Sequence, residues 1–162
     1  MSGERILVVD DERQNRQLLE SILEFGGYAP ISVADGNEAR LETISSYEKG
    51  QGIALIISDV QMPVMDGPSF YQKVIEFYAS KGTGAPLIIF MSGGMTDEQK
   101  TRVDGLNPFE LIQKPYDPEK LLDIIRRALE SSNLHKSSPR NPSYNPDIGF
   151  GLLSERPENC GP

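Results

Sequence analysis

Carboxylates follow two apolar stretches of this sequence. Asp59 comes directly after the stretch 53–57 and its polar neighbour Ser58, and Asp10 and Asp11 come directly after the stretch 5–9. Both stretches lack the polar alternation of a half-exposed strand, which indicates strands buried on both faces of a parallel sheet. A single aspartate at a strand end is more often a turn residue or a helix cap. Two such strand ends predict that the carboxylates meet at one sheet edge, where open α/β sheets bind ligands.

Three neighbouring carboxylates need a cation or protons. Each close pair repels by roughly 4 kcal/mol at a protein-surface dielectric unless a positive charge intervenes. Mg²⁺ suits such a site because it prefers oxygen ligands and needs only one or two protein carboxylates beside water and a phosphoryl oxygen. Zinc is not favoured, since the one histidine, His135, lies near the end of the last expected helix.

Two further polar side chains are expected at the same edge. Ser92 ends the apolar stretch 86–91 and offers a hydroxyl group, and Lys114 ends the stretch 109–113 and offers a compact positive charge. Taken alone, Ser92 is more often a turn residue and Lys114 a solvated surface charge. Together, a carboxylate nucleophile, a metal ion, a hydroxyl donor and a lysine describe phosphoryl transfer onto an aspartate.

Strand and helix patterns alternate along the chain. Strands are expected at 5–9, 28–33, 53–57, 86–91 and 109–113, and a helix after each. The first two helices show apolar residues at helical spacing, and the starts of helices two to five carry capping or turn residues. These are the stripes Leu18, Leu19, Ile22, Leu23 and Phe25, then Ala39, Leu41, Ile44 and Tyr47, and the starting residues Asp35, Pro68, Thr96 and Asp117.

This alternation predicts an α/β fold with a doubly wound, five-stranded parallel sheet. Strands one, three and four are continuously apolar, whereas strand two contains Pro30 and strand five is mixed in polarity, so two and five are expected at the edges. The order 2-1-3-4-5 satisfies this with right-handed crossovers. It places strands one and three together where the winding reverses, which is the expected ligand crevice.

Composition limits the class of protein. A formal charge of −8 argues against direct nucleic-acid binding, and no apolar stretch approaches a membrane span. The single cysteine, Cys160, fits a reducing, cytoplasmic setting. We expect one folded domain over residues 1–131. The remainder, 132–162, is rich in Pro and Ser and is expected to be a disordered tail with no second domain.

The joint pattern of motifs resembles the receiver domain of two-component response regulators, the CheY-like superfamily. The resemblance covers residues 4 to about 131 and rests on four segments, which read VDDE at 9–12, DVQMPVMDG at 59–67, MSG at 91–93 and KP at 114–115. It implies a flavodoxin-like fold with five strand–helix units. It also implies a cytoplasmic signalling protein that takes part in a phosphorelay.

The resemblance implies a role for each matching residue. Asp59 would accept a phosphoryl group from a histidine kinase or a histidine phosphotransfer protein, and Ser92 and Lys114 would bind phosphoryl oxygens. The Mg²⁺ ligands would be Asp11, Asp59 and the backbone carbonyl of Gln61, with Asp10 holding a metal-bound water. Self-phosphorylation from phosphodonors and autodephosphorylation would be the only reactions, so the protein is not expected to be an enzyme.

Two positions depart from the usual receiver pattern. Leu111 stands where receivers usually carry an aromatic switch residue, and leucine lacks both the flat ring and the polar end. We therefore expect altered coupling to the face formed by helix four, strand five and helix five, which is also the expected homodimer face. Gly94 and Gln61 lie where the family tunes dephosphorylation. Because Gly94 has no side chain to shield the acyl phosphate, a short-lived phosphorylated form is expected.

Other functions remain open at this point. A Mg²⁺-dependent phosphatase with an aspartate nucleophile is one alternative, although its nucleophile would follow strand one in an Asp-x-Asp arrangement that Asp10 and Asp11 do not form. A binding module with a vestigial acidic pocket is another. A third is the C-terminal receiver of a hybrid sensor histidine kinase. The cognate kinase, the stimulus and the downstream partner are not encoded in any recognisable motif.

Overall fold

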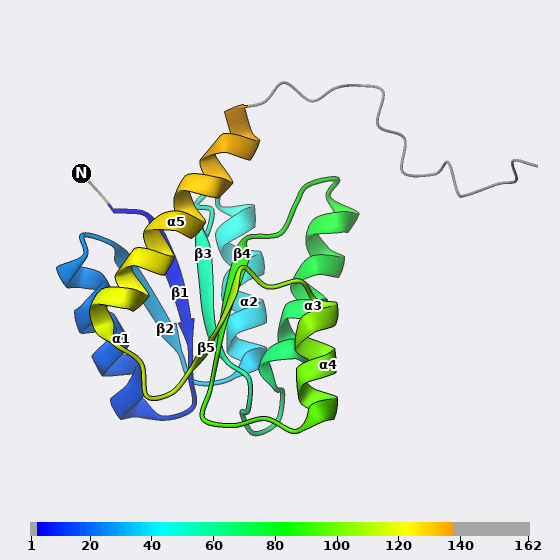
Figure 1. The fold of residues 1–162 in the computed structure, drawn as a ribbon. Helices are drawn as coiled ribbons and strands as arrows, with labels where there is room; N and C mark the ends of the chain where they lie inside the picture. Colours follow the sequence, from blue (N-terminus) through cyan, green and yellow to red (C-terminus); the bar gives the residue numbers. More distant parts are fainter. Residues whose placement is uncertain (1–2, 138–162) are drawn as a thin grey trace, which may run out of the picture.

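The computed structural model describes residues 3–137, which form a five-stranded parallel sheet with helices on both faces (Figure 1). The strand order is β2-β1-β3-β4-β5, so the predicted fold class and the two predicted edge strands are confirmed. The strands are β1 (Arg5–Val9), β2 (Ala29–Val33), β3 (Leu55–Asp59), β4 (Leu87–Ser92) and β5 (Glu110–Gln113). The helices are α1 (Arg13–Phe25), α2 (Gly36–Glu48), α3 (Gly67–Ser80), α4 (Asp97–Gly105) and α5 (Pro118–Ser137).

Each face of the sheet has its own apolar core. Side chains from alternate strand positions, such as Ile6 and Val8, pack under α1 and α5, whereas Leu7 and Val9 pack under α2, α3 and α4. All four are at most 1% exposed, as expected for a central strand of a doubly wound sheet. Figure 1 shows α1 and α5 together on one side of the sheet.

The register of the strands aligns their carboxyl ends. Val9 of β1 pairs with Ser58 of β3, so Asp10 and Asp59, each one residue further on, leave neighbouring strands at the same level. Ser92 is the last residue of β4 and pairs with Gln113, the last residue of β5. The register of the parallel strands therefore places the predicted site residues at one edge of the sheet.

Four of the predicted helix starts are capped by side chains. Asp35 accepts hydrogen bonds from two backbone amides in the first turn of α2, and Asp66 accepts one from an amide in the first turn of α3. Thr96 and Gln99 form a complete capping box at the start of α4. Asp117 accepts from two backbone amides in the first turn of α5. These caps confirm the expected starts of the four helices. Asp66 and Gln99 are described again below because they also bind residues outside their own helices.

Three residues of the expected apolar stripes lie on the surface. Phe25 is 88% exposed at the end of α1, and Leu18 and Leu41 are each about half exposed. In α2, Ala39 of the expected stripe is buried, and the other buried positions include Thr43 and Ser46, which were not expected. The prediction from periodicity was wrong at these three positions. An apolar residue at the margin of the buried face of a helix is covered only where another element packs against it, and periodicity does not show this.

The last helix is longer than expected. α5 continues to Ser137, six residues past the predicted end of the domain at 131. Between Pro118 and Pro139 the chain contains neither Gly nor Pro, so it has no residue there that would end the helix. The rest of the predicted tail, together with Cys160, lies outside the described residues.

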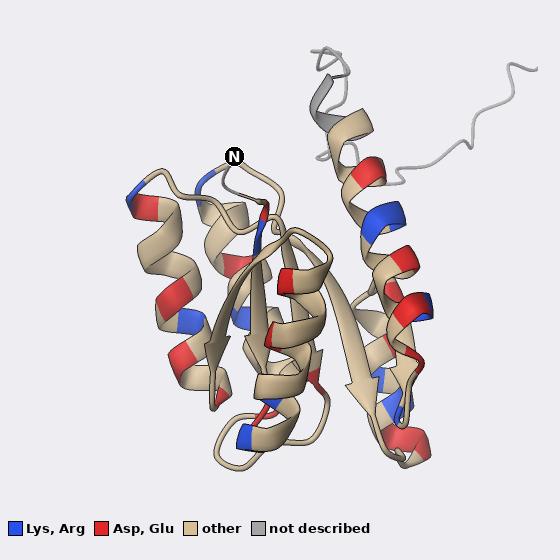
Figure 2. Cartoon of the chain, turned by 90° about the vertical axis from the view of Figure 1, so that its left-hand side faces the viewer, with Lys and Arg blue, Asp and Glu red and all other residues tan. Residues whose placement is uncertain are grey.

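Acidic and basic residues are mixed along the chain. Figure 2 marks their positions in the cartoon, where both kinds are interspersed along the helices. Within residues 3–137, no helix combines the length and the apolar character that crossing a membrane requires.

Candidate functional site

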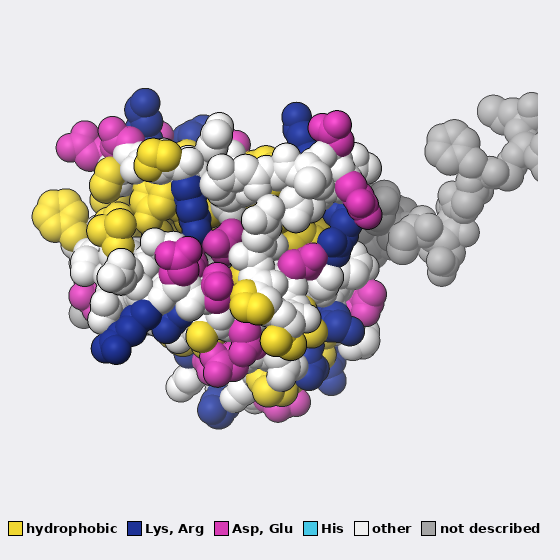
Figure 3. All heavy atoms as spheres, turned by 90° about the horizontal axis from the view of Figure 1, so that it is seen from below, with side chains coloured by type: hydrophobic (Ala, Val, Ile, Leu, Met, Phe, Trp, Pro, Cys, Tyr) yellow, Lys and Arg dark blue, Asp and Glu magenta, His cyan; other side chains and the backbone are white. Residues whose placement is uncertain are grey.

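Three carboxylates meet at the carboxyl end of the sheet. One oxygen from each of Asp10, Asp11 and Asp59 lies within 4.8 Å of the others. Asp10 is buried, Asp59 is partly buried and Asp11 is exposed, so the group opens to solvent on one side. Figure 3 views this end of the molecule, where acidic side chains gather near the middle of the face. The structure thus brings together the three aspartates that the sequence singled out.

Lys114 neutralises part of this charge. Its ammonium nitrogen donates to Oδ2 of Asp10 at 3.0 Å and to Oδ2 of Asp59 at 2.9 Å. Burial lowers the pKa of Lys114, but the hydrogen bonds to Asp59 and Asp10 outweigh burial and hold this pKa above its usual value. The lysine is therefore a fixed positive charge between Asp10 and Asp59.

Backbone amides orient the two inner carboxylates. The amide of Glu12 donates to Oδ1 of Asp10 at 2.8 Å, and the amide of Gln61 donates to Oδ1 of Asp59 at 3.1 Å. Asp59 thus has one oxygen on a backbone amide and the other on Lys114. Its side chain keeps 13% of its surface exposed, which leaves the carboxylate accessible to a small reactant.

Two residues of α1 support the site and were not predicted. Asn15 donates from its side-chain nitrogen to both oxygens of Asp10, at 3.5 and 3.3 Å. Arg16 donates to the backbone carbonyls of Asp10 and Asp11, at 2.8 and 3.1 Å. The available signal was their position in the first turn after the acidic segment, where side chains face back toward the strand end.

Gly67 lets the loop after β3 close against the strand. A Cβ atom at this position would lie 2.3 Å from the carbonyl oxygen of Asp59 and 3.0 Å from Oγ of Ser58. The amide of Gly67 also donates to the carbonyl of Val60 at 3.1 Å. The sequence indicated only a turn here, whereas the structure shows that glycine is required by close approach to the backbone of Asp59.

Ser92 lies at the same edge with its hydroxyl bonded inside its own loop. Oγ donates to the carbonyl of Gly94 at 2.8 Å and accepts from the amide of Gly94 at 3.1 Å. The residue is only 4% exposed. A role on a phosphoryl oxygen therefore requires the hydroxyl to exchange its bond with the Gly94 carbonyl for one with the ligand.

Gln61 reaches from the Asp59 loop to the next loop. Its side-chain nitrogen donates to the carbonyl of Gly94 and to Oε1 of Gln99, each at 3.1 Å. A second bridge lies nearby, where Arg102 of α4 donates to both oxygens of Asp66 at 2.8 and 3.3 Å. Burial raises the pKa of Asp66, but the hydrogen bonds from Arg102 and Ser69 prevail and lower it. Neither bridge was predicted from the sequence.

Leu111 of β5 is partly buried and packs on the core under α2, α3 and α4. It lines a cavity of about 300 Å³ that Ser92, Gly94 and Met95 also line. The residue expected to be the switch position thus shares an open space with the end of β4. Its side chain is smaller than an aromatic ring, which is consistent with that space.

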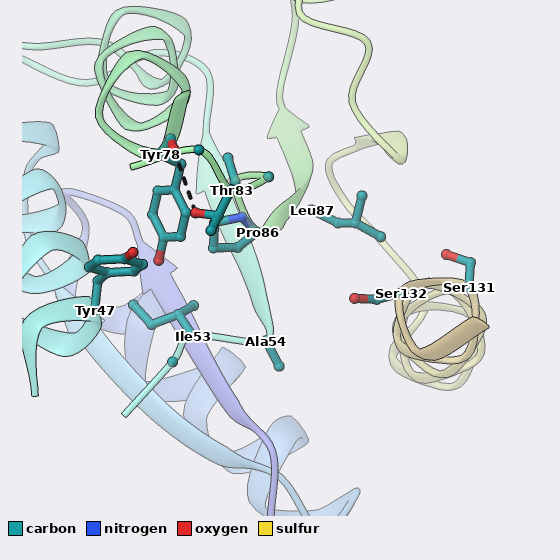
Figure 4. Close-up of a pocket in the computed structure, with 13 residues that line it drawn as sticks. Tyr47, Ile53, Ala54, Tyr78, Thr83, Pro86, Leu87, Ser131 and Ser132 are labelled. Carbon is teal, nitrogen blue, oxygen red and sulfur yellow. Dashed lines mark hydrogen bonds between the residues drawn. The ribbon is translucent and has the colours of Figure 1, made fainter. Parts of the chain in front are cut away.

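A larger cavity of about 790 Å³ lies at the opposite end of the sheet. Figure 4 shows the rings of Tyr47 and Tyr78 on one side of it and Ser131 and Ser132 of α5 on the other. The residues that line it carry no ionised side chain. The larger cavity therefore lacks the charged groups that make the acidic edge the candidate site.

The donor set of the acidic edge suits a hard cation. All three ligand atoms are carboxylate oxygens, and the open side next to Asp11 leaves room for water ligands. Lys114 offsets only part of the charge, because one ammonium group faces the three carboxylates. The residues present therefore fit a divalent metal ion. The Gln61 carbonyl as a further ligand remains a prediction.

Comparison with solved structures gives the same fold. The chemotaxis protein CheY4 of Vibrio cholerae is 30% identical and superposes with a TM-score of 0.67 over 79% of this chain and all of that one. A CheY-like receiver domain protein of Methanospirillum hungatei is 25% identical, with a TM-score of 0.70 over 83% of this chain and 99% of that one.

Curated sequences extend the likeness. A probable transcriptional regulator, ycf27, of Porphyridium aerugineum is 32% identical over 153 residues, which are 93% of this chain and 58% of the relative. Response regulator Rre1 of Synechocystis is 32% identical over 125 residues, 76% of this chain and 51% of the relative. The chain thus spans little more than half the length of these relatives.

The family model described as "Response regulator receiver domain" matches residues 6–126. The chain belongs to the response regulator receiver domain family and, with it, to two-component signal transduction.

Proposed function

We propose that the protein is a phosphoacceptor switch in which Asp59 takes a phosphoryl group from a phosphohistidine. One observation carries the proposal: the Asp59 carboxylate is accessible, hydrogen-bonded on both oxygens, and within 4.8 Å of two further carboxylates. A fixed nucleophile flanked by a cation and by groups able to hold a metal is the arrangement that phosphoryl transfer requires.

The transfer itself is a simple displacement. A carboxylate oxygen of Asp59 attacks the phosphorus atom, the P–N bond to the donor imidazole breaks, and the imidazole keeps the electron pair and is later protonated. Lys114 offsets negative charge on the phosphoryl oxygens, and the Ser92 hydroxyl donates to one of them after leaving the Gly94 carbonyl. Hydrolysis of the acyl phosphate by water returns Asp59 to its free form.

Mg²⁺ is the metal we propose for the acidic edge. Asp11, Asp59 and the Gln61 carbonyl would hold it, and Asp10 would hold one of its waters. When bound, the ion supplies positive charge that neutralises phosphoryl oxygens. Asn15 and the backbone amide of Glu12 hold the Asp10 carboxylate in place beside the site.

The donor and the receiver of the signal are separate proteins in this proposal. The donor is a histidine kinase or a histidine phosphotransfer protein, and the downstream partner contacts a surface that changes on phosphorylation. A homodimer through α4, β5 and α5 is a further proposal for that surface. A reducing cytoplasm remains the expected setting, and phosphorylation and dephosphorylation of Asp59 the only expected reactions.

Two larger contexts fit the same domain. The matched segment covers 58% of one relative named a probable transcriptional regulator and 49% of another, which supports an output domain in those proteins. The receiver domain of a signal transduction histidine kinase from Syntrophus aciditrophicus is also similar, at 26% identity and a TM-score of 0.66. The reaction proposed for Asp59 is the same in either context.

The proposal is tested by incubation with acetyl phosphate with and without Mg²⁺, followed by intact mass measurement. We expect a Mg²⁺-dependent gain of one phosphoryl group in the native chain and in Asp97→Asn, an exposed carboxylate of α4 that serves as the control. Asp59→Asn should gain none. A gain that persists in Asp59→Asn would overturn the assignment. A Mg²⁺-dependent phosphatase would instead hydrolyse a phosphomonoester over many turnovers.

A further inference from the structure

The side-chain amide of Gln61 is held by two acceptors that lie outside its own loop. Its Nε2 donates to the carbonyl of Gly94 and to Oε1 of Gln99, while its backbone amide donates to Asp59. The side chain therefore spans from the loop that carries the phosphoacceptor to the loop after β4. The backbone amide of the same residue binds Oδ1 of Asp59, which is the oxygen that Lys114 does not bind.

Gln99 is itself rigidly placed. Its Oε1 accepts from the amide of Thr96 at 2.9 Å, and its own amide donates to Oγ1 of Thr96 at 3.2 Å. This reciprocal capping box fixes the Gln99 side chain before any ligand is present. The carbonyl oxygen that receives Gln61 is thus an acceptor set in position by the helix start.

The last turn of α4 ties the helix to the segment after Asp59 at a second point. α4 has one fully buried side chain, Val103, so apolar packing fixes it only weakly. Arg102 adds an ion pair with Asp66 at 2.8 Å and a hydrogen bond to Ser69 at 2.9 Å. Because both bridges end on the segment that follows Asp59, α4 and its Gln99 hold a defined position relative to the phosphoacceptor.

Gly94 leaves the space beside the site without a side chain. A Cβ atom at Gly94 would meet no heavy atom within 4 Å. Ser92 and Gln61 both donate to its carbonyl oxygen, so this carbonyl is where the two loops join. The side-chain amide of Gln61 reaches this junction from the loop that carries Asp59.

We propose that Gln99 is a positioning residue that holds the Gln61 amide across the open side of the phosphoacceptor site and so slows the approach of water to phosphorylated Asp59. The inference rests on the proposed function of Asp59. Without the Gln99 acceptor, the Gln61 side chain keeps only its bond to Gly94 and rotates away for part of the time. Losing one ordinary hydrogen bond corresponds to about a five-fold change in such an equilibrium.

The test measures how fast phosphorylated protein loses its phosphoryl group in Mg²⁺ buffer after the phosphodonor is removed. Gln99→Met removes the acceptor but keeps the length of the side chain, and we expect decay about five-fold faster than in the native chain. Gln99→Glu keeps an oxygen for both Thr96 and Gln61, so its decay should match the native rate. Gln61→Met should also decay faster, and the double variant Gln61→Met/Gln99→Met no faster than either single one.

A control separates positioning from mere fraying of α4. Thr96→Ala weakens the same helix cap, yet it leaves Oε1 of Gln99 available to Gln61. Its decay should stay near the native rate, and thermal unfolding should show that its stability falls as much as that of Gln99→Met. Equal acceleration in Thr96→Ala and Gln99→Met would overturn the proposal, as would multiplicative effects in the double variant.

The two levels of the proposal fail in different ways. The intact mass before decay begins reports whether Asp59 is phosphorylated. If the native chain has gained no phosphoryl group, both the proposed function and the inference are wrong. Full phosphorylation with a native decay rate in Gln99→Met would end the inference alone. In the unphosphorylated protein, the side-chain amide resonances of Gln61 should shift in Gln99→Met and not in Gln99→Glu.

Discussion

Lys114 donates a hydrogen bond to Oδ2 of Asp59 at 2.9 Å, although 55 residues separate the two in sequence. The bond joins the residue after β5 to the last residue of β3 and crosses the end of the intervening strand β4. The same ammonium group binds Asp10 at 3.0 Å. In the free protein, Lys114 thus offsets charge that a metal ion would also offset.

Replacing Lys114 by Met should make stability depend more strongly on Mg²⁺. The variant leaves the buried carboxylate of Asp10 beside Asp59 without its cation, so we expect the free energy of unfolding in EDTA to fall by about 1–3 kcal/mol. Mg²⁺ should then restore more stability to the variant than to the native chain. Urea unfolding with and without Mg²⁺ measures both effects. Lys120→Met, an exposed position of α5, is the control, and an equal Mg²⁺ effect in all three proteins would contradict the prediction.

Replacing Gly67 by Ala should disturb the phosphoacceptor through the backbone. The added methyl group would lie 2.3 Å from the Asp59 carbonyl, so the loop must shift, and we expect a loss of about 1–3 kcal/mol of stability. Phosphorylation by acetyl phosphate should also slow, because Asp59 moves with the loop. Gly52→Ala provides the matched control, since a Cβ there meets nothing within 4 Å. The prediction is wrong if the two variants behave alike.

The ion pair between Asp66 and Arg102 should contribute stability only above the acid range. Because the pKa of Asp66 is lowered in the folded protein, its contribution is fully present above the unfolded pKa of about 3.9 and is lost as pH falls through the folded pKa. Asp66→Asn keeps a good helix cap. We therefore expect it to cost less than about 1 kcal/mol at pH 7, since the pair is partly exposed, and less than that near pH 2.5, which lies below the unfolded pKa.

Urea unfolding at the two pH values measures this difference. Arg102→Met should reproduce the loss at pH 7, and the double variant should add little to either single one, because the same pair is removed. A destabilisation by Asp66→Asn that is unchanged near pH 2.5 would show that the carboxylate charge is not responsible.

Replacing Leu111 by Tyr should strengthen the response of the face formed by α4, β5 and α5. The new ring can enter the cavity of about 300 Å³ beside Leu111, which Ser92 also lines, so its position becomes sensitive to movement of the Ser92 hydroxyl. Amide chemical shifts recorded before and after phosphorylation report the response. Leu111→Met conserves volume without adding a ring and is the control. An identical response of Leu111→Tyr and the native chain would refute the expectation.

The sequence predicts the sheet and its acidic edge because both depend on local patterns. Apolar stretches that end in Asp10, Asp59 and Ser92 identify buried parallel strands, and the parallel arrangement then brings their ends together. The bridge from Gln61 to Gln99 is different in kind. It depends on two side-chain conformations and on the placement of α4, and neither is encoded in residue spacing.

The exposure of apolar side chains at the margins of helices could likewise not be predicted from the sequence. Phe25 and Leu18 fit the apolar stripe of α1 but lie outside its covered face. Gly67 reads as an ordinary turn residue until the carbonyl of Asp59 is seen against it. In each case the deciding contact is with a residue or an element far away in space, which local periodicity does not report.

Helix α5 starts next to the acidic edge and ends at the other end of the molecule, past the start of the strands (Figure 1). Its 20 residues span about 30 Å, so it connects the loop after Lys114 with the far end of the molecule. A tilt of about 10° at that loop would displace the far end by about 5 Å. Whatever is joined to Ser137 would therefore receive an amplified displacement, although it lies far from the carboxylates.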